Sequence, residues 1–427
     1  MSSGRLARVV GIPGAVLMGL GSIIGTGIFV SVGVAAGVAG PAVVLAVVLA
    51  AIVATFNGLS SAQLAASHPV SGGTYEYGYR YLNPALGFTA GWMFLCAKSA
   101  SAATAALGFA GYTLAPFDVT DRWARVGAGV AIVAALTAVL AGGMQRSSRT
   151  NAIIVSFTLL ALAAFVLAGL PTALDGAATN FDGALTGTGA RDLLHATALM
   201  FVAYTGYGRI ATLGEEVKEP ATTIPRAIVL ALLGTMTLYV AVVGVAVAAV
   251  GAGPLAAATR EAAAPLEMVA GQLAVPEVRY LVAAAAITAM IGVLLNLLLG
   301  LSRVLLAMAR RGDMPRALAQ IDESRASPRR AVLVTGLGIA GLTLLGSVKT
   351  TWSFSAFTVL VYYALTNLAA LRLPPEHRRY PRWVSALGLA SCLGLAFWVE
   401  VRIWLAGLAL VALGLVWHLV ARRRSDG

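Results

Sequence analysis

Glycine and hydroxyl residues cluster in one segment near the start of the chain, Gly21-Ser22-Ile23-Ile24-Gly25-Thr26-Gly27-Ile28-Phe29. Residues 9–75 around this segment contain no Asp, Glu, Lys or Arg. A helix in hydrocarbon must satisfy its own backbone, so an interruption survives there only if protein buries it or it lines a polar cavity. Freed main-chain groups of this kind can bind a small ligand. The competing interpretation is helix packing, because Gly21 and Gly25 form a small-xxx-small pair.

A second segment has the same character, Phe201-Val202-Ala203-Tyr204-Thr205-Gly206-Tyr207-Gly208-Arg209. Two interrupted helices at matching positions indicate a transport site. A helix restarting near Gly27 would direct free N–H groups and a positive dipole end toward a carboxylate. Carbonyls near Ile23 and at Val202 to Ala203 would suit an ammonium group. Together these groups predict a site for an α-amino acid.

The composition indicates that these segments lie in a membrane. Of the 427 residues, 59% are hydrophobic and 11% are charged, with a mean hydropathy of +0.85. Soluble domains carry about 25% charged residues. The two cysteines, Cys96 and Cys392, lie in apolar segments and predict neither a disulfide framework nor a metal site. No removable signal peptide is expected.

Membrane spans provide the elements that would position both segments. With roughly 20 apolar residues for each span, the sequence predicts about twelve spans: 10–36, 42–66, 85–114, 126–142, 152–170, 194–213, 227–251, 279–309, 331–346, 352–372, 383–399 and 403–421. The two glycine-rich segments fall in spans 1 and 6. These are the first members of two five-helix halves.

The distribution of basic residues predicts the orientation. If the N-terminus is cytoplasmic, 21 of the 30 Lys and Arg residues lie on the cytoplasmic side and 7 lie outside. This positive-inside bias predicts cytoplasmic N- and C-termini in a multi-pass protein of the cell membrane. The basic charge then orients the protein in its bilayer, and a nucleic-acid role, which needs one clustered basic face, is not expected.

Lys98 is the most unusual side chain. It lies near the middle of span 3, in a stretch from 82 to 117 that contains no other charged residue. An arginine stays protonated, whereas a lysine in an apolar environment can lose its proton. Because ionisable residues within a membrane are usually functional, we expect Lys98 to couple transport to protons or to organise the site. The alternative is that Lys98 extends toward an interface or satisfies a carbonyl at a helix end.

Four motifs resemble those of the amino acid–polyamine–organocation permease superfamily, along nearly the whole chain. They are Gly21 to Phe29, Pro69-Val70-Ser71-Gly72-Gly73-Thr74-Tyr75 with Gly91-Trp92, Gly214 to Ala227, and Ser302-Arg303 through Ala307-Met308-Ala309-Arg310. The resemblance implies an all-α integral membrane protein with a leucine-transporter-like fold and alternating access. It implies one transporter domain over 1–427, with a five-plus-five inverted repeat (9–170 and 194–372) and two additional C-terminal helices (383–421). Helices 1 and 6 would be discontinuous.

The same resemblance implies which residues bind the substrate. Helix 1 would contribute Ile23, Gly25, Thr26 and Gly27, and helix 6 would contribute Val202, Ala203 and Thr205. Tyr204, Tyr207, Arg209 and Glu216 are expected to line the site or its gates. Several proton-coupled relatives carry a lysine in helix 5, seven residues after an asparagine. Here Thr158 takes that place after Asn151, so that coupling residue cannot be carried over to this chain.

Arg209 and Glu216 allow two interpretations each. Arg209 could meet a substrate carboxylate, or could pair with Glu216 about two helical turns further on. Glu216 could pair with a loop arginine at an inner gate, or could simply be exposed to solvent at the end of a helix.

We therefore expect a secondary active transporter of amino acids that takes up neutral amino acids together with protons. An obligate exchanger is the alternative, as is an acidic substrate bound through Arg209. A hypothesis from a different functional class is a membrane sensor that binds an amino acid without transporting it. An enzyme is not expected, because no nucleophile, base and orienting group converge. We expect the substrate, protons and the lipid bilayer as partners and no cofactor or metal ion. No pattern indicates an oligomeric state.

Overall fold

The computed structural model of the protein describes residues 10–69, 72–143, 148–184, 187–212, 217–322 and 327–425, with the main chain alone at 148 and 422–425. These residues are largely helical, and the only β-type pairings among them are two isolated bridges, Val10 with Val217 and Asp322 with Ser327. The all-helical fold expected from the sequence is therefore present.

The helices follow the apolar segments of the sequence. In the first half they are α1 (Ile12–Ile23), η1 (Gly27–Ser31), α2 (Val32–Ala39), η2 (Gly40–Ala42), α3 (Val43–Ser67), α4 (Thr74–Tyr81), α5 (Pro84–Leu114), η3 (Ala115–Phe117), α6 (Arg122–Ala141) and α7 (Ser148–Asn180). In the second half they are α8 (Ala190–Tyr204), η4 (Thr205–Tyr207), α9 (Gly208–Ala211), α10 (Pro220–Val250), α11 (Ala252–Glu261), α12 (Pro265–Ala270), α13 (Val278–Arg310), η5 (Arg316–Ala319), α14 (Arg329–Thr343), α15 (Val348–Leu371), η6 (Pro375–His377), α16 (Arg382–Ala396) and α17 (Val401–Ser425).

Eight helical segments in the described part of the chain are long and apolar enough to cross a membrane. One of them, Ile12–Ser67, covers the first two expected spans. The expected spans 194–213, 331–346 and 383–399 coincide with shorter helices, namely α8 with η4 and α9, α14, and α16. The count of twelve spans and the inverted repeat remain predictions.

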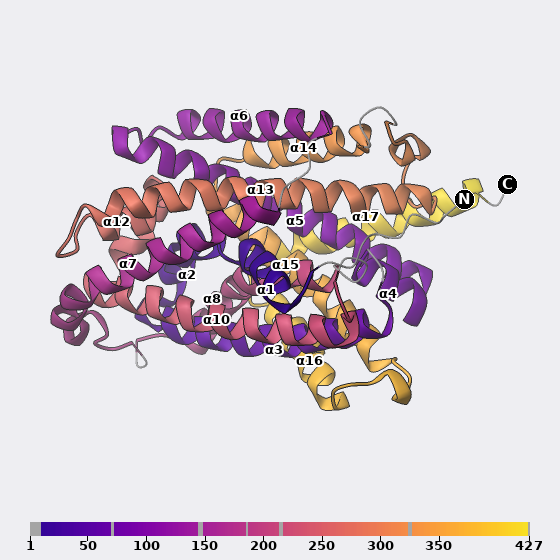
Figure 1. Ribbon diagram of the computed structural model, residues 1–427, viewed down its shortest axis with the longest axis horizontal. Coiled ribbons are helices and arrows are strands. Elements are labelled where there is room, and N and C mark those ends of the chain that lie inside the picture. The colour runs from indigo at the N-terminus through magenta and orange to yellow at the C-terminus, as the bar shows by residue number, and fades with distance from the viewer. Residues whose placement is uncertain are drawn as a thin grey trace.

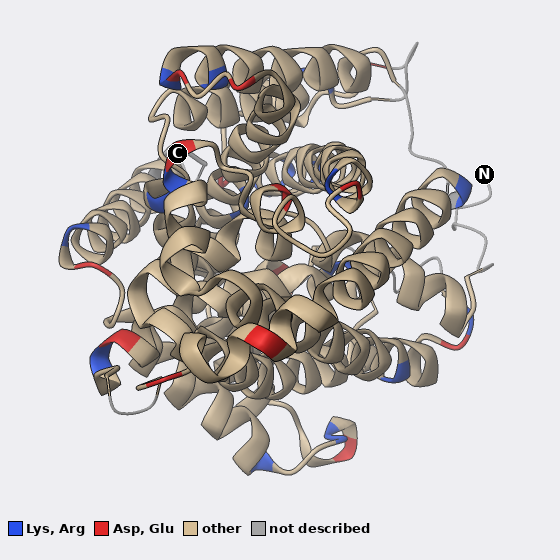
Figure 2. Ribbon diagram, turned by 90° about the vertical axis from the view of Figure 1, so that its left-hand side faces the viewer, with Lys and Arg blue, Asp and Glu red and all other residues tan. Residues whose placement is uncertain are grey.

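The long helices run side by side along the longest axis of the molecule, with α12 at one end and α4 toward the other (Figure 1). Helices α15 and α5 lie at the centre of the bundle. In their most apolar stretches, 78% and 72% of the residues are buried, compared with 22% for α17. Lys, Arg, Asp and Glu are sparse along the ribbon and gather at helix ends and connecting segments (Figure 2). Charge is thus largely confined to the places where a spanning helix leaves the hydrocarbon.

Helix α7 shows the lipid-facing surface most clearly. Ile153, Leu160, Leu167 and Leu174 repeat every seven residues and are 69%, 69%, 68% and 77% exposed. That spacing places them on one face of the helix. Such a continuous apolar stripe would be unfavourable in water but is expected against lipid tails.

Asp313, just after α13, ties three elements together near α4. Its side chain is 3% exposed. Tyr75 and Tyr79 of α4 each donate a 2.7 Å hydrogen bond to Asp313 Oδ2, and His418 Nδ1 of α17 lies 3.1 Å from Oδ1. The indole of Trp417 donates to the Asp313 carbonyl at 2.9 Å. Burial and the hydrogen bond to Asp313 raise the pKa of Tyr75, so this phenol stays protonated and remains a donor.

Replacing Asp313 should therefore destabilise this end of the helical bundle. The substitution Asp313→Ala leaves the hydroxyls of Tyr75 and Tyr79 without their acceptor, which should lower the free energy of unfolding by about 1–3 kcal/mol. Thermal unfolding in detergent measures the effect. The exposed Asp175 of α7 offers a matched control, and Asp175→Ala should change the stability by no more than about 0.5 kcal/mol. Equal melting temperatures for the two variants would contradict the bridging role of Asp313.

Candidate functional site

The first glycine-rich segment interrupts its helix as expected. Helix α1 ends at Ile23, and Ile24 is extended, with φ −79° and ψ 110°. The chain resumes a helical course as the π-helical turn η1 at Gly27 and continues into α2. No side chain caps the start of η1, where Thr26 occupies the capping position. The first N–H groups of a helix have no partner within the helix. Those of Ile28 and Phe29 already donate to the Gly25 carbonyl at 3.1 Å, which leaves the N–H of Gly27 as the main-chain donor that could meet an anion.

The second segment changes its helical pitch. Helix α8 ends at Tyr204, the 3₁₀ turn η4 covers Thr205–Tyr207, and α9 follows from Gly208. The Thr205 hydroxyl donates to the Val202 carbonyl at 2.8 Å, and the Thr205 carbonyl accepts from Tyr363 of α15 at 3.1 Å. The discontinuity here is a tightening of the helix into a 3₁₀ turn. The carbonyls of Val202 and Thr205 have side-chain donors from Thr205 and Tyr363.

Glycines bring the two interruptions into direct contact. A methyl group on Gly206 would overlap the Ser22 carbonyl and lie 2.5 Å from the nitrogen of Ile23. A methyl group on Gly27 would overlap the Ala203 side chain and lie 2.8 Å from its Cα. The close packing that competed with binding as an interpretation is therefore real. It also holds the main-chain groups of both segments together.

A small cavity of about 40 Å³ lies where the two segments meet. Among its lining residues are six of the seven residues expected to bind substrate, together with Lys98: Ile23, Thr26, Gly27, Val202, Ala203 and Thr205. The cavity has room for a few water molecules. An amino acid would enter it only if the surrounding helices separated.

Lys98 projects from α5 into this cavity. Its side chain is 9% exposed, and Nζ donates to Thr205 Oγ1 at 2.9 Å. The described lining residues include neither Asp nor Glu. The Lys98 amine thus lies beside the 3₁₀ turn η4 that follows α8. The described lining of the cavity has no carboxylate to balance a positive charge there.

Thr26 provides an unused polar group. Its side chain is 4% exposed, and Oγ1 has no hydrogen-bond partner among the described residues. A buried hydroxyl without a partner costs free energy. Either a water molecule or a ligand in the cavity could supply that partner.

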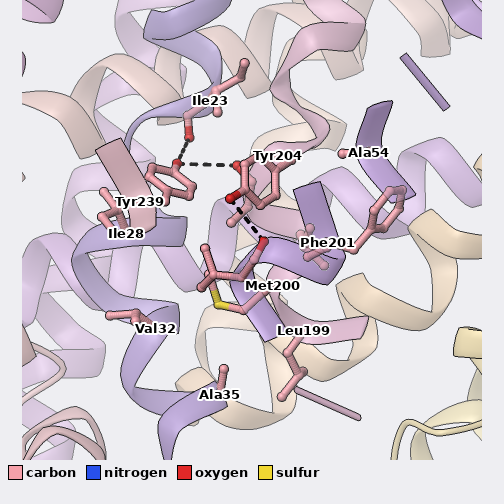
Figure 3. Packing of buried hydrophobic residues seen from close by; sticks show 14 of the residues in the cluster. Ile23, Ile28, Val32, Ala35, Ala54, Leu199, Met200, Phe201, Tyr204 and Tyr239 are labelled. Carbon is pink, nitrogen blue, oxygen red and sulfur yellow. Dashed lines mark hydrogen bonds between the residues drawn. The ribbon is translucent and has the colours of Figure 1, made fainter. Parts of the chain in front are cut away.

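Tyr239 of α10 is a residue that the sequence did not indicate. Its hydroxyl donates to the Ile23 carbonyl at 2.9 Å and also lies 3.4 Å from the Ala203 carbonyl (Figure 3). These are carbonyls that we expected to face an ammonium group. Tyr239 already uses part of their accepting capacity and bridges the two interrupted helices.

The cavity has further lining residues: Ser22 and Gly206 within the two interrupted segments, and Ser101, Val293, Leu297 and Trp352 on α5, α13 and α15. The indole of Trp352 donates to the Leu199 carbonyl at 2.9 Å, and the Ser101 hydroxyl is 2.7 Å from that of Ser355. Ser101 could have been inferred, because it lies three residues after Lys98 and so shares its helix face. Nothing near Trp352 or Val293 in the sequence indicates this location.

The remaining candidates lie outside the described lining of the cavity. Gly25 packs against Val293. The Tyr204 hydroxyl donates to the Val47 carbonyl at 3.3 Å, and Tyr207 packs on Tyr363 with ring centroids 5.4 Å apart. Arg209 is half-buried on α9.

Glu216 falls outside the described residues. Its expected pairing with Arg209 and its expected role at an inner gate therefore remain predictions.

Together, the lipid-facing helices and the buried polar cavity between two interrupted helices are typical of membrane transporters. Comparison with known proteins agrees, because the profile of the family described as "Amino acid permease" matches residues 14–426. The chain therefore belongs to the amino acid permease family. It is a multi-pass integral membrane protein of the transporter class.

Individual relatives are also transporters. An uncharacterized transporter of Mycobacterium tuberculosis is 42% identical over 424 residues, which cover 98% of this chain and 92% of the relative. Two proteins of Bacillus subtilis are more distant. The methylthioribose transporter is 27% identical, covering 99% of this chain and 95% of its own. The branched-chain amino acid permease BcaP is 28% identical, covering 92% and 86%.

The contact between the two interruptions leads to a test by substitution. Gly206→Ala would push a methyl group into the backbone of Ser22 and Ile23, which should lower the melting temperature and cost about 1–3 kcal/mol. Gly244→Ala in α10 is the matched control, because its methyl group would meet nothing within 4 Å. That substitution should be neutral or stabilising by up to about 1 kcal/mol. If Gly206→Ala behaves like Gly244→Ala, the two segments are not in backbone contact.

Proposed function

We propose that the protein is a secondary active transporter that takes up neutral amino acids together with protons by alternating access. The observation that carries this proposal is the small cavity between α1–η1 and α8–η4, which is lined both by Lys98 and by Thr26 with its unpartnered hydroxyl. Family membership supports an amino acid as substrate. The printed names of relatives extend from a branched-chain amino acid permease to a methylthioribose transporter, so the side chain that is preferred is left to experiment.

The two ends of an amino acid have different partners in this proposal. The N–H of Gly27 and the Thr26 hydroxyl would bind the carboxylate at the uncapped start of η1, where the helix dipole favours an anion. The N–H groups of Ile28 and Phe29 would become available only if their bonds to the Gly25 carbonyl opened. The carbonyls of Ile23, Val202 and Ala203 would accept from the ammonium group. Each carbonyl oxygen has two lone pairs, so the bonds from Tyr239 and Thr205 leave accepting capacity.

Lys98 would carry the coupled proton. When protonated, it donates to Thr205 and places a positive charge in a cavity whose described lining has no carboxylate. The carboxylate of an entering substrate would compensate this charge. Loss of the proton after the helices rearrange would weaken that attraction and favour release. The small volume of the cavity supports such a cycle, because about 40 Å³ holds an amino acid only after the helices move.

The alternative functions differ in the role that they give to Lys98 and in whether the ligand is transported. An obligate exchanger would use Lys98 to organise the site without titration, and a sensor would bind without turnover. Binding of an acidic substrate through Arg209 loses support, because Arg209 is not among the described residues that line the cavity. Placement in the cell membrane with cytoplasmic termini is also part of the proposal and is supported by the distribution of basic residues.

Transport by purified protein in liposomes tests the proposal. Uptake of radiolabelled neutral amino acids would be followed with an imposed pH gradient, and separately with unlabelled amino acid inside. Gradient-driven uptake is expected. Uptake that requires internal amino acid would select the exchanger, and binding without uptake would select the sensor.

Lys98→Gln tests the coupling residue. Glutamine retains a donor for Thr205 but cannot carry the proton, so gradient-driven uptake should fall by at least about tenfold, a conservative figure beside the roughly 10²–10⁴-fold that one positioned proton-transfer group contributes. Amino-acid binding should weaken, because the positive charge is lost, but should stay measurable. Lys218→Gln is the control, because Lys218 is exposed, and it should leave uptake unchanged. Gradient-driven uptake that survives Lys98→Gln at the wild-type rate would remove Lys98 from the coupling mechanism.

Thr26→Val tests the carboxylate site. The substitution preserves the shape of the side chain and removes the unpartnered hydroxyl, so the dissociation constant should rise about tenfold, equivalent to one hydrogen bond of about 1.4 kcal/mol. Isothermal titration calorimetry on purified protein measures it. Thr237→Val, on an exposed face of α10, should leave the dissociation constant unaltered. Equal affinity in the wild type and Thr26→Val would show that the ligand does not reach Thr26.

A further inference from the structure

A second and much larger cavity lies toward the end of the molecule where α12 is found (Figure 1). Its volume is about 420 Å³, and its walls come from α2, α6, α11 and the start of α15. Arg122, Arg125, Arg260 and Lys349 all line it. In the orientation expected from the sequence, these four residues are external. We call this cavity the outer vestibule.

The outer vestibule has an excess of positive charge. Four of its lining residues are basic, and none of its described lining residues is acidic. The acidic groups nearby compensate only part of this charge. Glu400 pairs with Lys349 at 2.5 Å, while Asp121 and Glu261 are the chain neighbours of Arg122 and Arg260. A hollow lined by charges of one sign concentrates solutes of the opposite sign.

Local bonds hold two of the arginines in place. Arg122 donates to the Leu345 carbonyl at 2.8 Å, and Arg125 donates to the Glu261 carbonyl. Arg122 also packs on Gly346, where a methyl group would lie 2.7 Å from its Nε and where φ is +62°. A guanidinium has five N–H donors, so each arginine can bind an anion while remaining anchored. Preorganised donors of this kind bind carboxylates well.

The outer vestibule leads toward the central cavity. Helix α15 lines the vestibule with Val348 and Lys349 and lines the central cavity with Trp352. These positions are about one helical turn apart. Helix α2 with η1 makes the same connection, with Gly33 on the vestibule and Gly27 on the central cavity. Trp352, whose indole donates to the Leu199 carbonyl, lines the central cavity one turn from the vestibule residue Val348.

We propose that the outer vestibule is an anion-binding site that captures carboxylate-bearing solutes before they reach the central cavity. It would favour acidic amino acids over neutral ones and repel cationic ones, so that the substrate range extends to acidic amino acids. The role as an entry site rests on the proposed transport function. The binding of a carboxylate in the vestibule does not, and can be measured without transport.

Thiol reactivity in the vestibule tests this site. Val38 lines the cavity and is half-buried, so Val38→Cys places a thiol there with little change in size. Purified protein in nanodiscs would be treated with the anionic 2-sulfonatoethyl and the cationic 2-(trimethylammonium)ethyl methanethiosulfonate. Both rates are normalised to those of 2-mercaptoethanol. The unsubstituted protein gives the background from Cys96 and Cys392, and Val275→Cys gives a surface control, since Val275 is 51% exposed.

The normalised rate at Val38→Cys should be at least about tenfold higher for the anionic reagent than for the cationic one, as expected for a focused positive field. Adding Arg260→Glu should reduce this ratio severalfold, and Arg260→Lys should preserve it. L-glutamate should protect the thiol at lower concentration than L-glutamine, L-arginine or chloride. Equal normalised rates, or a ratio that Arg260→Glu leaves unchanged, would overturn the proposal. Equal protection by L-glutamate and L-glutamine, or by chloride, would also overturn it.

The outcome is separable from that of the proposed function. Selective protection by L-glutamate in a protein that takes up no amino acid would retain the anion site and remove transport. Proton-driven uptake of neutral amino acids without charge preference at Val38→Cys would retain transport and remove the anion site.

Discussion

Backbone contact between the two interrupted helices is the constraint on which the rest of the site depends. Gly206 lies against the main chain of Ser22 and Ile23, and Gly27 lies against Ala203. Larger residues at either glycine would force the helices apart. The contact keeps the uncapped start of η1 beside the carbonyls near the end of α8. The same glycines therefore pack the two helices against each other and hold in place the main-chain groups that we propose bind the substrate.

An excess of positive charge is the second theme of the molecule. Lys98 lines the central cavity and four basic residues line the outer vestibule, while the described lining of both spaces contains no carboxylate. In the central cavity, the charge of a protonated, buried Lys98 is costly unless it is paired or lost with the proton. A substrate carboxylate, a change in protonation of Lys98, or both in sequence would remove that cost. This requirement links substrate recognition to proton coupling in the proposed cycle.

Local sequence pattern was enough to predict the helical membrane fold and both interruptions, because glycine and threonine stand out in an apolar stretch. It also identified Lys98 and the segments that line the central cavity. The contact between Lys98 and Thr205 could not be predicted, since it depends on how α5 packs beside α8. Tyr239 and Trp352 come from other helices and carry no local signal. Asp313 is similar, because its partners lie on α4 and α17.

The most direct test of the central claim is a cryo-electron microscopy structure with a bound amino acid, chosen as the one that most raises the melting temperature of the protein. The account predicts density for the ligand between η1 and η4, with its carboxylate within hydrogen-bonding distance of Thr26 and the main chain of Gly27. The surrounding helices should be further apart than they are around the present cavity of about 40 Å³. An ordered amino acid bound elsewhere, with the contact between Gly27 and Ala203 unchanged and the cavity no larger than at present, would contradict the account.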